Sequence, residues 1–208
     1  ESHKCAIQFD FQNAFGTIDR NKIVERLIYY DINRTIINYI IYILNSQEMI
    51  YEIDGETRVI ELQTGVPQGE PLSMVLFSLG IDALLEKFEN KNGINVTAYA
   101  DDVVVTVENE EMIKTVMEEF GNDATEYGLN LNKMKTKINL KRNITVEEID
   151  RYGLDGMEIV NMNESSSTYV GLPLTLNRKY EIEFVKSKVE EVANITQQLW
   201  QTRTPVQM

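Results

Sequence analysis

The sequence predicts an α+β domain in which an antiparallel sheet packs on helices. Short β-favouring runs alternate with segments whose apolar residues recur at helical spacing. Two pairs of β runs are separated by short turns, which is typical of antiparallel hairpins. The order of strand, two helices, hairpin, helix, hairpin, helix and strand belongs to the α+β class, and 208 residues suit one such domain with a small appendage.

In the first half of the chain, one turn pair and one Gly- and Pro-containing loop mark where the predicted strands and helices begin and end. Asp54-Gly55 tolerates positive φ and therefore predicts a hairpin. A Gly- and Pro-containing loop at 64–71 leads into a long helix. The expected elements are, in order, a strand, two helices, two strands and a helix, at residues 6–11, 21–30, 35–46, 49–53, 57–62 and 72–88.

The second half predicts a further hairpin and two amphipathic helices. Gly128 suits the left-handed cap that ends the first of these helices. Residues 144–163 are acidic and are expected to be irregular, whereas 169–176 suggest a strand pair around Gly171 and Pro173. The remaining elements are two strands, a helix, an extended segment with a basic cluster and a final helix, at 95–99, 103–107, 110–127, 129–140 and 180–200.

Composition and charge exclude only a few kinds of site and indicate no particular function. With 20 basic and 33 acidic residues the net charge is -13, so the chain repels phosphate backbones on average and composition indicates no affinity for nucleic acid. The single cysteine, Cys5, excludes an internal disulfide and a cysteine zinc site. The apolar runs at 36–44 and 74–79 are too short to span a bilayer, so no membrane contact is expected. The expected location is inside the cell, nuclear or cytoplasmic.

Three acidic residues stand where strands end or turn. Asp10 closes an apolar strand, where burial of a carboxylate is costly unless it is paired or binds a cation; a strand-end acid that faces water is the alternative. Asp101 and Asp102 occupy the second hairpin turn, where Asp is also common for conformational reasons. If the two strands pair, the carboxylates become neighbours, and a divalent ion would make their charges favourable together. Since adjacent strand residues point to opposite faces, Asp101 is expected to be the stronger ligand beside Asp10.

Five segments resemble, in the right order, motifs A to E of reverse transcriptases of the non-LTR retrotransposon (LINE-like) type. The resemblance spans roughly residues 6–175. The segments are Ile-Gln-Phe-Asp-Phe-Gln-Asn-Ala-Phe at 7–15, Gly-Val-Pro-Gln-Gly-Glu-Pro-Leu-Ser at 65–73, Tyr-Ala-Asp-Asp at 99–102, Gly-Leu-Asn-Leu-Asn at 128–132 with Lys135-Thr136, and Tyr-Val-Gly at 169–171.

The resemblance implies a polymerase palm with a ferredoxin-like core over residues 1–180. Residues 181–208 would be the start of a thumb helix or a C-terminal helix, with the fingers and most of the thumb absent from this sequence. The rest of a larger polyprotein, or partner chains, would then supply those parts.

The same resemblance assigns the catalytic centre. Asp10, Asp101, Asp102 and the backbone carbonyl of Phe11 would hold two Mg²⁺ ions, with Mn²⁺ as the alternative. Oxygen ligands suit Mg²⁺, and two such ions support in-line displacement at phosphorus. Lys135 would lie near the triphosphate and protonate the leaving group, although an isolated lysine is most often a solvated surface charge.

Further residues would hold the substrates. Phe15 would exclude a ribose 2′-hydroxyl, and a core aromatic is its alternative reading. Pro67, Gln68 and Gly69 would contact the incoming nucleotide and template, although a plain Pro/Gly loop explains them too. The segment Tyr169, Val170 and Gly171 would position the primer end, and an ordinary strand turn is the alternative.

Four positions depart from the family pattern. Asn13 stands where related elements usually have Lys, and Gly16 where they usually have Asp. Glu70 replaces Ser and adds negative charge beside the expected nucleotide site, and Met74 replaces Pro.

The resemblance implies an RNA-directed DNA polymerase that adds dNTPs to a primer 3′-OH, with an RNA template and a DNA primer as partners. A palm-like scaffold without catalysis is the alternative, favoured by the acidic composition. An RNA-directed RNA polymerase is disfavoured because Phe15 would obstruct a ribonucleotide.

Overall fold

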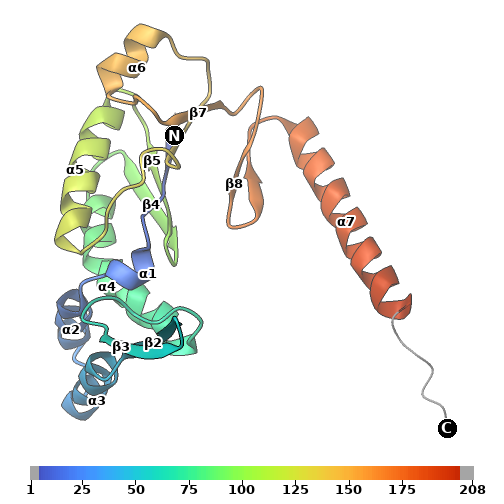
Figure 1. The fold of residues 1–208 in the computed structure, drawn as a ribbon. Helices are drawn as coiled ribbons and strands as arrows, with labels where there is room; N and C mark the ends of the chain where they lie inside the picture. The colour runs from blue at the N-terminus through green and yellow to red at the C-terminus, as the bar shows by residue number, and fades with distance from the viewer. Residues whose placement is uncertain (1–4, 202–208) are drawn as a thin grey trace.

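A computed structural model describes residues 5–201, and a five-stranded sheet forms its centre (Figure 1). The strand order is β4-β5-β1-β6-β7. β1 pairs antiparallel with both β5 and β6, and β5 pairs antiparallel with β4. The bounds are Ile94–Tyr99 for β4, Asp102–Val107 for β5, Cys5–Phe9 for β1, Lys137–Leu140 for β6 and Glu158–Asn161 for β7.

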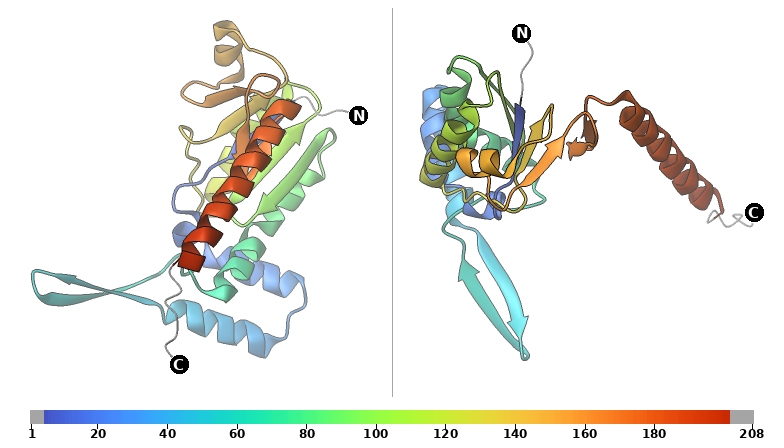
Figure 2. Two further views of the ribbon diagram at one scale, coloured as in Figure 1. Left: turned by 90° about the vertical axis from the view of Figure 1, so that its right-hand side faces the viewer. Right: turned by 90° about the horizontal axis from the view of Figure 1, so that it is seen from above.

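Two helices cover one face of this sheet. α4 (Pro71–Glu89) and α5 (Met112–Glu126) pack there, while the hairpin β8–β9 and helix α7 lie on the opposite side (Figure 2). Alternate residues of β1, such as Ile7 and Phe9, are buried in the same core as Phe77 of α4 and Phe120 of α5. Burial of these large apolar side chains is the main force that fixes the sheet against the helices.

The expected antiparallel α+β fold is confirmed. The core contains, in this order along the chain, β1, α4, β4, β5, α5 and β6. Its strands lie in the order β6-β1-β5-β4, which is the ferredoxin-like arrangement. One feature was not predicted: β7 joins the sheet parallel to β6.

A helical pair and a hairpin extend from one end of the sheet. α2 (Arg20–Tyr29) and α3 (Arg34–Asn45) are followed by β2 (Glu48–Ile53) and β3 (Glu56–Glu61), which confirms the two helices and the Asp54-Gly55 hairpin. The hairpin projects away from the body of the molecule (Figure 2). It leaves apolar side chains exposed: Met49, Ile50, Ile53, Val59 and Ile60.

Two local expectations are wrong. The acidic segment 144–163 is not irregular, because it contains α6 (Val146–Tyr152) and β7. The segment 129–140 is not extended throughout, since residues 133–135 form a turn and the strand begins at Lys137. A short helix, α1 (Ala14–Thr17), also went unpredicted after the first strand.

α6 begins with a reciprocal cap that explains why an acidic segment folds. The Thr145 hydroxyl accepts a hydrogen bond from the Glu148 amide, and the Glu148 carboxylate accepts one from the Thr145 amide. The same carboxylate binds Arg142 at 2.6 Å. These bonds, with that to Arg142 the largest contribution, lower the pKa of Glu148 to about 2.

Glu148→Gln is therefore expected to destabilise the protein in a pH-dependent way. A carboxyl whose pKa is depressed in the folded state stabilises it fully above the unfolded pKa near 4.5, and that stability is lost as the pH falls toward 2. Urea unfolding of wild type and variant should show a constant difference from pH 5 to 7 that shrinks below pH 4. A difference that stays constant down to pH 2.5 would contradict the assignment.

The C-terminal part of the described chain lies outside the sheet. β8 (Ser167–Tyr169) and β9 (Leu172–Leu174) form the expected strand pair, and α7 (Arg178–Gln201) extends away from the body (Figures 1 and 2). α7 carries the expected final helix, and residues 202–208 of the predicted C-terminal segment lie outside the described residues, as do residues 1–4. Within residues 5–201 no helix is both long and apolar enough to cross a membrane.

Candidate active site

Asp10 lies on the face of the sheet opposite α4 and α5. Its neighbours Phe9 and Phe11 are both buried, and their rings stack on Phe120 at centroid distances of 4.3 and 6.3 Å. Because side chains alternate along an extended strand, the Asp10 side chain points away from this aromatic cluster. The strand thus presents a half-buried carboxylate on the face opposite the helices, the side on which the β8–β9 hairpin lies.

The hairpin that joins β4 and β5 carries the other two acids. Tyr99 pairs with Asp102, so Ala100 and Asp101 form a two-residue turn and Asp102 is the first residue of β5. Phe9 of β1 pairs with Val103, which places Asp102 beside Asp10 at the next step of the ladder. The predicted pairing of the two acidic strands is therefore confirmed, but the residue that this register sets opposite Asp10 is Asp102, whereas Asp101, the expected neighbour, lies in the turn.

The three carboxylates influence one another. Burial raises the pKa of Asp102, and the charges of Asp101 and Asp10 raise the pKa further. Each of these negative charges disfavours ionisation of the Asp102 carboxyl, as expected where like charges share one site. The site therefore has an uncompensated negative potential, which a cation would relieve.

The turn at this site is conformationally strained. Ala100 has a φ of 53°, in the left-handed region that L residues other than Asn, Asp and Gly seldom occupy. Outliers of this kind often occur at functional positions, where the surrounding structure holds them. Here the β4–β5 ladder holds the turn and keeps both acids at its end.

The carbonyl of Phe11 is also oriented toward the hairpin. Phe11 forms an isolated bridge with Leu131, flanked by bonds from the Gln12 amide to Asn130 and from the Asn132 amide to Asp10. In such a pair the carbonyl of the central residue points away from its partner strand. Since β1 lies between β5 and β6, this carbonyl faces the β5 side.

The donor set fits a hard divalent ion in its chemistry. Carboxylate and carbonyl oxygens are the ligands that Mg²⁺ prefers, and the repulsion among the three acids favours its binding. The side chains are not gathered into a finished cage, however. Among residues 5–201, no group of three or more His, Cys, Asp or Glu side chains is close enough to hold an ion.

The loop before α4 docks tightly on α1, which follows Asp10. The Val66 amide donates to the Phe15 carbonyl at 2.7 Å, and the Gly65 amide donates to Ile18 at 2.9 Å. Gly65 has a φ of 75°, and a Cβ there would lie 2.4 Å from backbone atoms of Gly16. Only glycine permits this approach, which joins the Phe15 segment to the 65–73 segment.

Phe15 is half-buried at this junction. Its ring stacks on Phe77 of α4 at 4.6 Å and 17°. The structure thus places Phe15 at the edge of the core, where it serves packing while part of the ring stays accessible. Its expected role in selecting the sugar remains a prediction.

Arg20 organises the same loop and was not predicted. Its guanidinium is buried and donates to the carbonyls of Leu62, Thr64 and Gly65 at 2.6, 3.1 and 2.8 Å. These bonds fix the backbone that leads into Pro67 and Gln68. No signal in one sequence distinguishes such an arginine from a surface charge, because its partners are carbonyls more than 40 residues away.

The departures at Asn13 and Gly16 are coupled. Asn13 adopts the left-handed conformation, with φ of 48°, and its amide group lies where a Cβ on Gly16 would be, at 2.4 Å. A side chain at position 16 would therefore require Asn13 to move. Both residues line a cavity of about 430 Å³ together with Pro67 and Gln68.

Glu70 and Gly69 lie at the start of α4. Glu70 is exposed at the N-cap, and its side chain forms no cap hydrogen bond. A negative charge there interacts favourably with the helix dipole, which gives this departure from Ser a structural reason. Gly69 has a φ of 92° and open space around it.

The segment around Lys135 is tied to Asp10 through Thr136. The Asp10 amide donates to the buried Thr136 hydroxyl at 3.3 Å, and that hydroxyl donates to Asn132 at 3.0 Å. Lys135 itself is exposed in the adjacent turn. Its position beside the strand of Asp10 suits the predicted role, and Thr136, the next residue of the same motif, ties this turn to Asp10.

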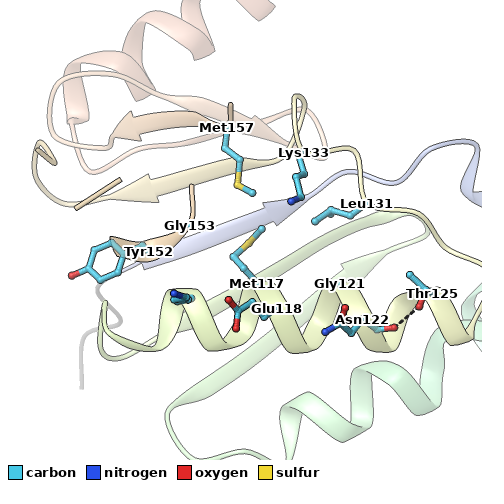
Figure 3. Close-up of a pocket in the computed structure, with 11 residues that line it drawn as sticks. Met117, Glu118, Gly121, Asn122, Thr125, Leu131, Lys133, Tyr152, Gly153 and Met157 are labelled. Carbon is cyan, nitrogen blue, oxygen red and sulfur yellow. Dashed lines mark hydrogen bonds between the residues drawn. The ribbon is translucent and has the colours of Figure 1, made fainter. Parts of the chain in front are cut away.

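The basic cluster predicted over 133–142 is partly neutralised. Lys137 pairs with Glu158 at 2.9 Å, and Arg142 pairs with Glu110 at 2.7 Å and with Glu148. Lys133 has an exposed side chain in the wall of a cavity of about 340 Å³ between α5 and α6 (Figure 3). That cavity contains none of the predicted site residues.

The β8–β9 hairpin reaches the acids through Tyr169. The Tyr169 hydroxyl makes long hydrogen bonds to the carbonyls of Thr97 and Asp102, at 3.4 and 3.5 Å. Burial, and after it the charge of Asp102, raises the pKa of Tyr169. Val170 and Gly171 form the turn with φ of 48° and 76°, a strained conformation for a β-branched residue.

A family model described as "Reverse transcriptase (RNA-dependent DNA polymerase)" matches residues 1–174. The chain belongs to the reverse transcriptase family. This match confirms the resemblance that the five motifs indicate. The matched range contains Asp10, Asp101 and Asp102.

Curated relatives place this reverse transcriptase domain near retrotransposon proteins. It is 28% identical over 141 residues to a Pol polyprotein of the type-1 retrotransposable element R2 from Popillia japonica, covering 62% of this chain and 20% of that protein. It is 26% identical over 193 residues to the polyprotein of the type-2 element R2DM from Drosophila melanogaster, covering 84% and 18%. The chain thus spans about a fifth of the length of these relatives.

Solved structures support the fold. A telomerase from Candida tropicalis, determined with a fragment of telomeric RNA, matches with a TM-score of 0.61 and 17% identity over 82% of this chain and 28% of that one. The apo form truncated from its C-terminal domain matches with a TM-score of 0.60. At this identity the similarity shows a shared reverse transcriptase fold.

Proposed function

We propose that this chain is the catalytic core of an RNA-directed DNA polymerase that extends a primer 3′-OH with dNTPs. The observation that carries the proposal is the placement of Asp10 and Asp102 at adjoining ends of β1 and β5, with Asp101 in the adjacent turn, within a chain of the reverse transcriptase family. An RNA template and a DNA primer are the proposed partners. Other parts of a larger polyprotein, or partner chains, would supply the remaining contacts to the duplex.

Asp10, Asp101 and the Phe11 carbonyl would hold two Mg²⁺ ions, with Asp102 as a supporting acid. Divalent ions held by these residues would supply positive charge that lowers the pKa of the primer hydroxyl and offsets negative charge on the leaving phosphate. The sheet sets the positions of these residues, because β1 and the β4–β5 hairpin are hydrogen-bonded neighbours in it. Lys135, from its exposed turn beside the Asp10 strand, would give a proton to the pyrophosphate.

Substrate positioning would use the residues around the two loops. Pro67 and Gln68 line the cavity next to Asn13 and would contact the nucleotide and template, with Gly69 allowing close backbone approach. Tyr169, Val170 and Gly171 would guide the primer end toward the acids. The Tyr169 hydroxyl already lies near the backbone of Asp102.

Phe15→Val is expected to relax sugar selection. A smaller side chain removes the part of the ring that would meet a ribose 2′-hydroxyl, so the ratio of rNTP to dNTP incorporation should rise by roughly tenfold to a hundredfold. Loss of the stack on Phe77 should also lower the free energy of unfolding by about 1–2 kcal/mol.

Phe77→Leu is the matched control, because it weakens the same stack from the buried side and leaves the Phe15 ring itself in place. Incorporation ratios measured by primer extension should change in Phe15→Val and remain at the wild-type value in Phe77→Leu. An unchanged ratio in both variants would assign Phe15 to the core alone.

Primer extension tests the function directly. The protein, in its longest native form, is given a primed RNA template, dNTPs and Mg²⁺, with a chelator in a parallel reaction. Extension that the chelator abolishes supports the polymerase. Binding of a protein partner without metal-dependent nucleotide binding or extension would instead support the non-catalytic scaffold.

A further inference from the structure

A buried polar network links the strand of Asp10 to the β8–β9 hairpin. Asn139 of β6, Gln8 of β1 and Ser167 of β8 expose 0, 9 and 3% of their surface. The Asn139 amide donates to the Gln8 side chain at 3.0 Å and to the Ala6 carbonyl at 3.1 Å. Its oxygen accepts a hydrogen bond from the Ser167 hydroxyl at 2.6 Å.

The network continues to the hairpin backbone. The Gln8 amide donates to the Thr168 carbonyl at 3.0 Å, so Gln8 and Asn139 together hold two successive residues of β8. Each side-chain group of Gln8 and Asn139 has a partner across an element boundary. Polar groups this deeply buried are costly unless they are paired, so a network satisfied in this way strongly favours one position of the hairpin.

Its place in the fold connects it to the acids. Gln8 precedes Asp10 by two residues and therefore lies on the same face of β1. The Tyr169 hydroxyl reaches the Asp102 carbonyl from the next residue of β8. One end of the network thus belongs to the strand that carries a metal-ligand candidate, and the other to the hairpin proposed to hold the primer.

We propose that Gln8, Asn139 and Ser167 are positioning residues that set the location of the primer-holding hairpin relative to Asp10. This inference rests on the proposed polymerase function. The three residues do not touch a substrate. They act through β8, because a hairpin that lost these bonds would no longer keep Tyr169 at a fixed distance from Asp102.

Two variants test the proposal. Ser167→Ala removes one hydrogen bond, and Gln8→Met keeps the approximate shape of the side chain while removing both of its bonds. Ser166→Ala is the matched control, since Ser166 is exposed and one residue away. All four proteins are compared in their longest native form, with urea unfolding to verify that each is folded.

The kinetic readout separates positioning from a loss of folded protein. In Ser167→Ala the KM for primer–template is expected to rise about tenfold, which is the effect of one buried hydrogen bond, and in Gln8→Met, which removes two, it should rise by at least as much. The KM for dNTP should remain within about twofold of wild type. A smaller folded fraction would lower only the apparent kcat and leave both KM values unchanged.

Amide hydrogen exchange provides the second readout. Peptides covering 167–174 should exchange faster in both variants, whereas peptides from β1 and β5 keep their protection and Ser166→Ala matches wild type. Wild-type KM values in both variants, or a rise in the KM for dNTP equal to that for primer–template, would overturn the proposal. A wild-type protein that extends no primer would instead overturn the polymerase function itself, so the two failures are distinguishable.

Discussion

Replacing Asp10 with Asn is expected to lower the rate of dNTP incorporation by roughly a thousandfold. A metal ion contributes several kcal/mol of transition-state stabilisation, and about 4 kcal/mol corresponds to that factor. The amide keeps the size of the side chain but removes the charge that would hold the ion. Single-turnover primer extension at saturating Mg²⁺ measures the loss.

The stability of this variant distinguishes a lost site from a lost fold. Burial and the charges of Asp101 and Asp10 raise the pKa of Asp102, and removing the Asp10 charge relieves the last of these, so Asp10→Asn should unfold at no lower urea concentration than wild type without metal. Asp31→Asn is the control, because Asp31 is exposed and Asn tolerates its φ of 53°. Equal loss of activity in both variants would contradict a specific role for Asp10.

Gly65→Ala is expected to destabilise the protein by about 3 kcal/mol, the largest effect on folding among these variants. The left-handed conformation of an alanine costs about 1–2 kcal/mol, and forcing a methyl group into a packed site costs about 1–3 kcal/mol. The obstacle is the backbone of Gly16 and Phe15, which cannot rotate away as a side chain can. Urea unfolding monitored by circular dichroism measures the change.

Gly153→Ala separates the two costs. Gly153 has a φ of 68° but open space around it, so the substitution should cost only the conformational part, about 1–2 kcal/mol. If Gly65→Ala and Gly153→Ala destabilise the protein equally, the close packing of Gly65 against the backbone of Phe15 and Gly16 is not needed for stability. A larger effect at Gly65 also predicts weaker dNTP binding, because the same loop carries Pro67 and Gln68.

Local signals predicted much of this fold. The turn pair Asp54-Gly55 and the β-branched runs on both sides of Asp101 located both hairpins to within one residue. Gly128, with φ of 78°, ends α5 as expected. These features depend on residues close in sequence, which is why a single sequence reveals them.

Long-range features were harder to predict. The parallel pairing of β6 with β7 joins segments separated by α6, and the acidic residues of that helix conceal its short apolar face. A regular helix there depends on the cap between Thr145 and Glu148 and on Arg142. Sequence reasoning identified neither, because it weighed average charge above local capping.

The candidate site shows the same division. Motif spacing located Asp10, Asp101 and Asp102, and the sheet register then placed their strands side by side. The supporting groups Arg20 and Asn139 were missed because each forms its hydrogen bonds with residues distant in sequence. Such residues have no motif of their own and become visible only when the elements are packed together.

The most direct test of the central claim is metal-dependent incorporation of a single dNTP on a primed RNA template by the longest native form of the protein. We predict that wild type adds the nucleotide with Mg²⁺, that a chelator prevents the addition, and that Asp10→Asn reduces it by roughly a thousandfold. No incorporation by a folded wild-type protein, in reactions where a known reverse transcriptase is active, would contradict the claim. The chain would then be a reverse transcriptase palm that serves as a scaffold.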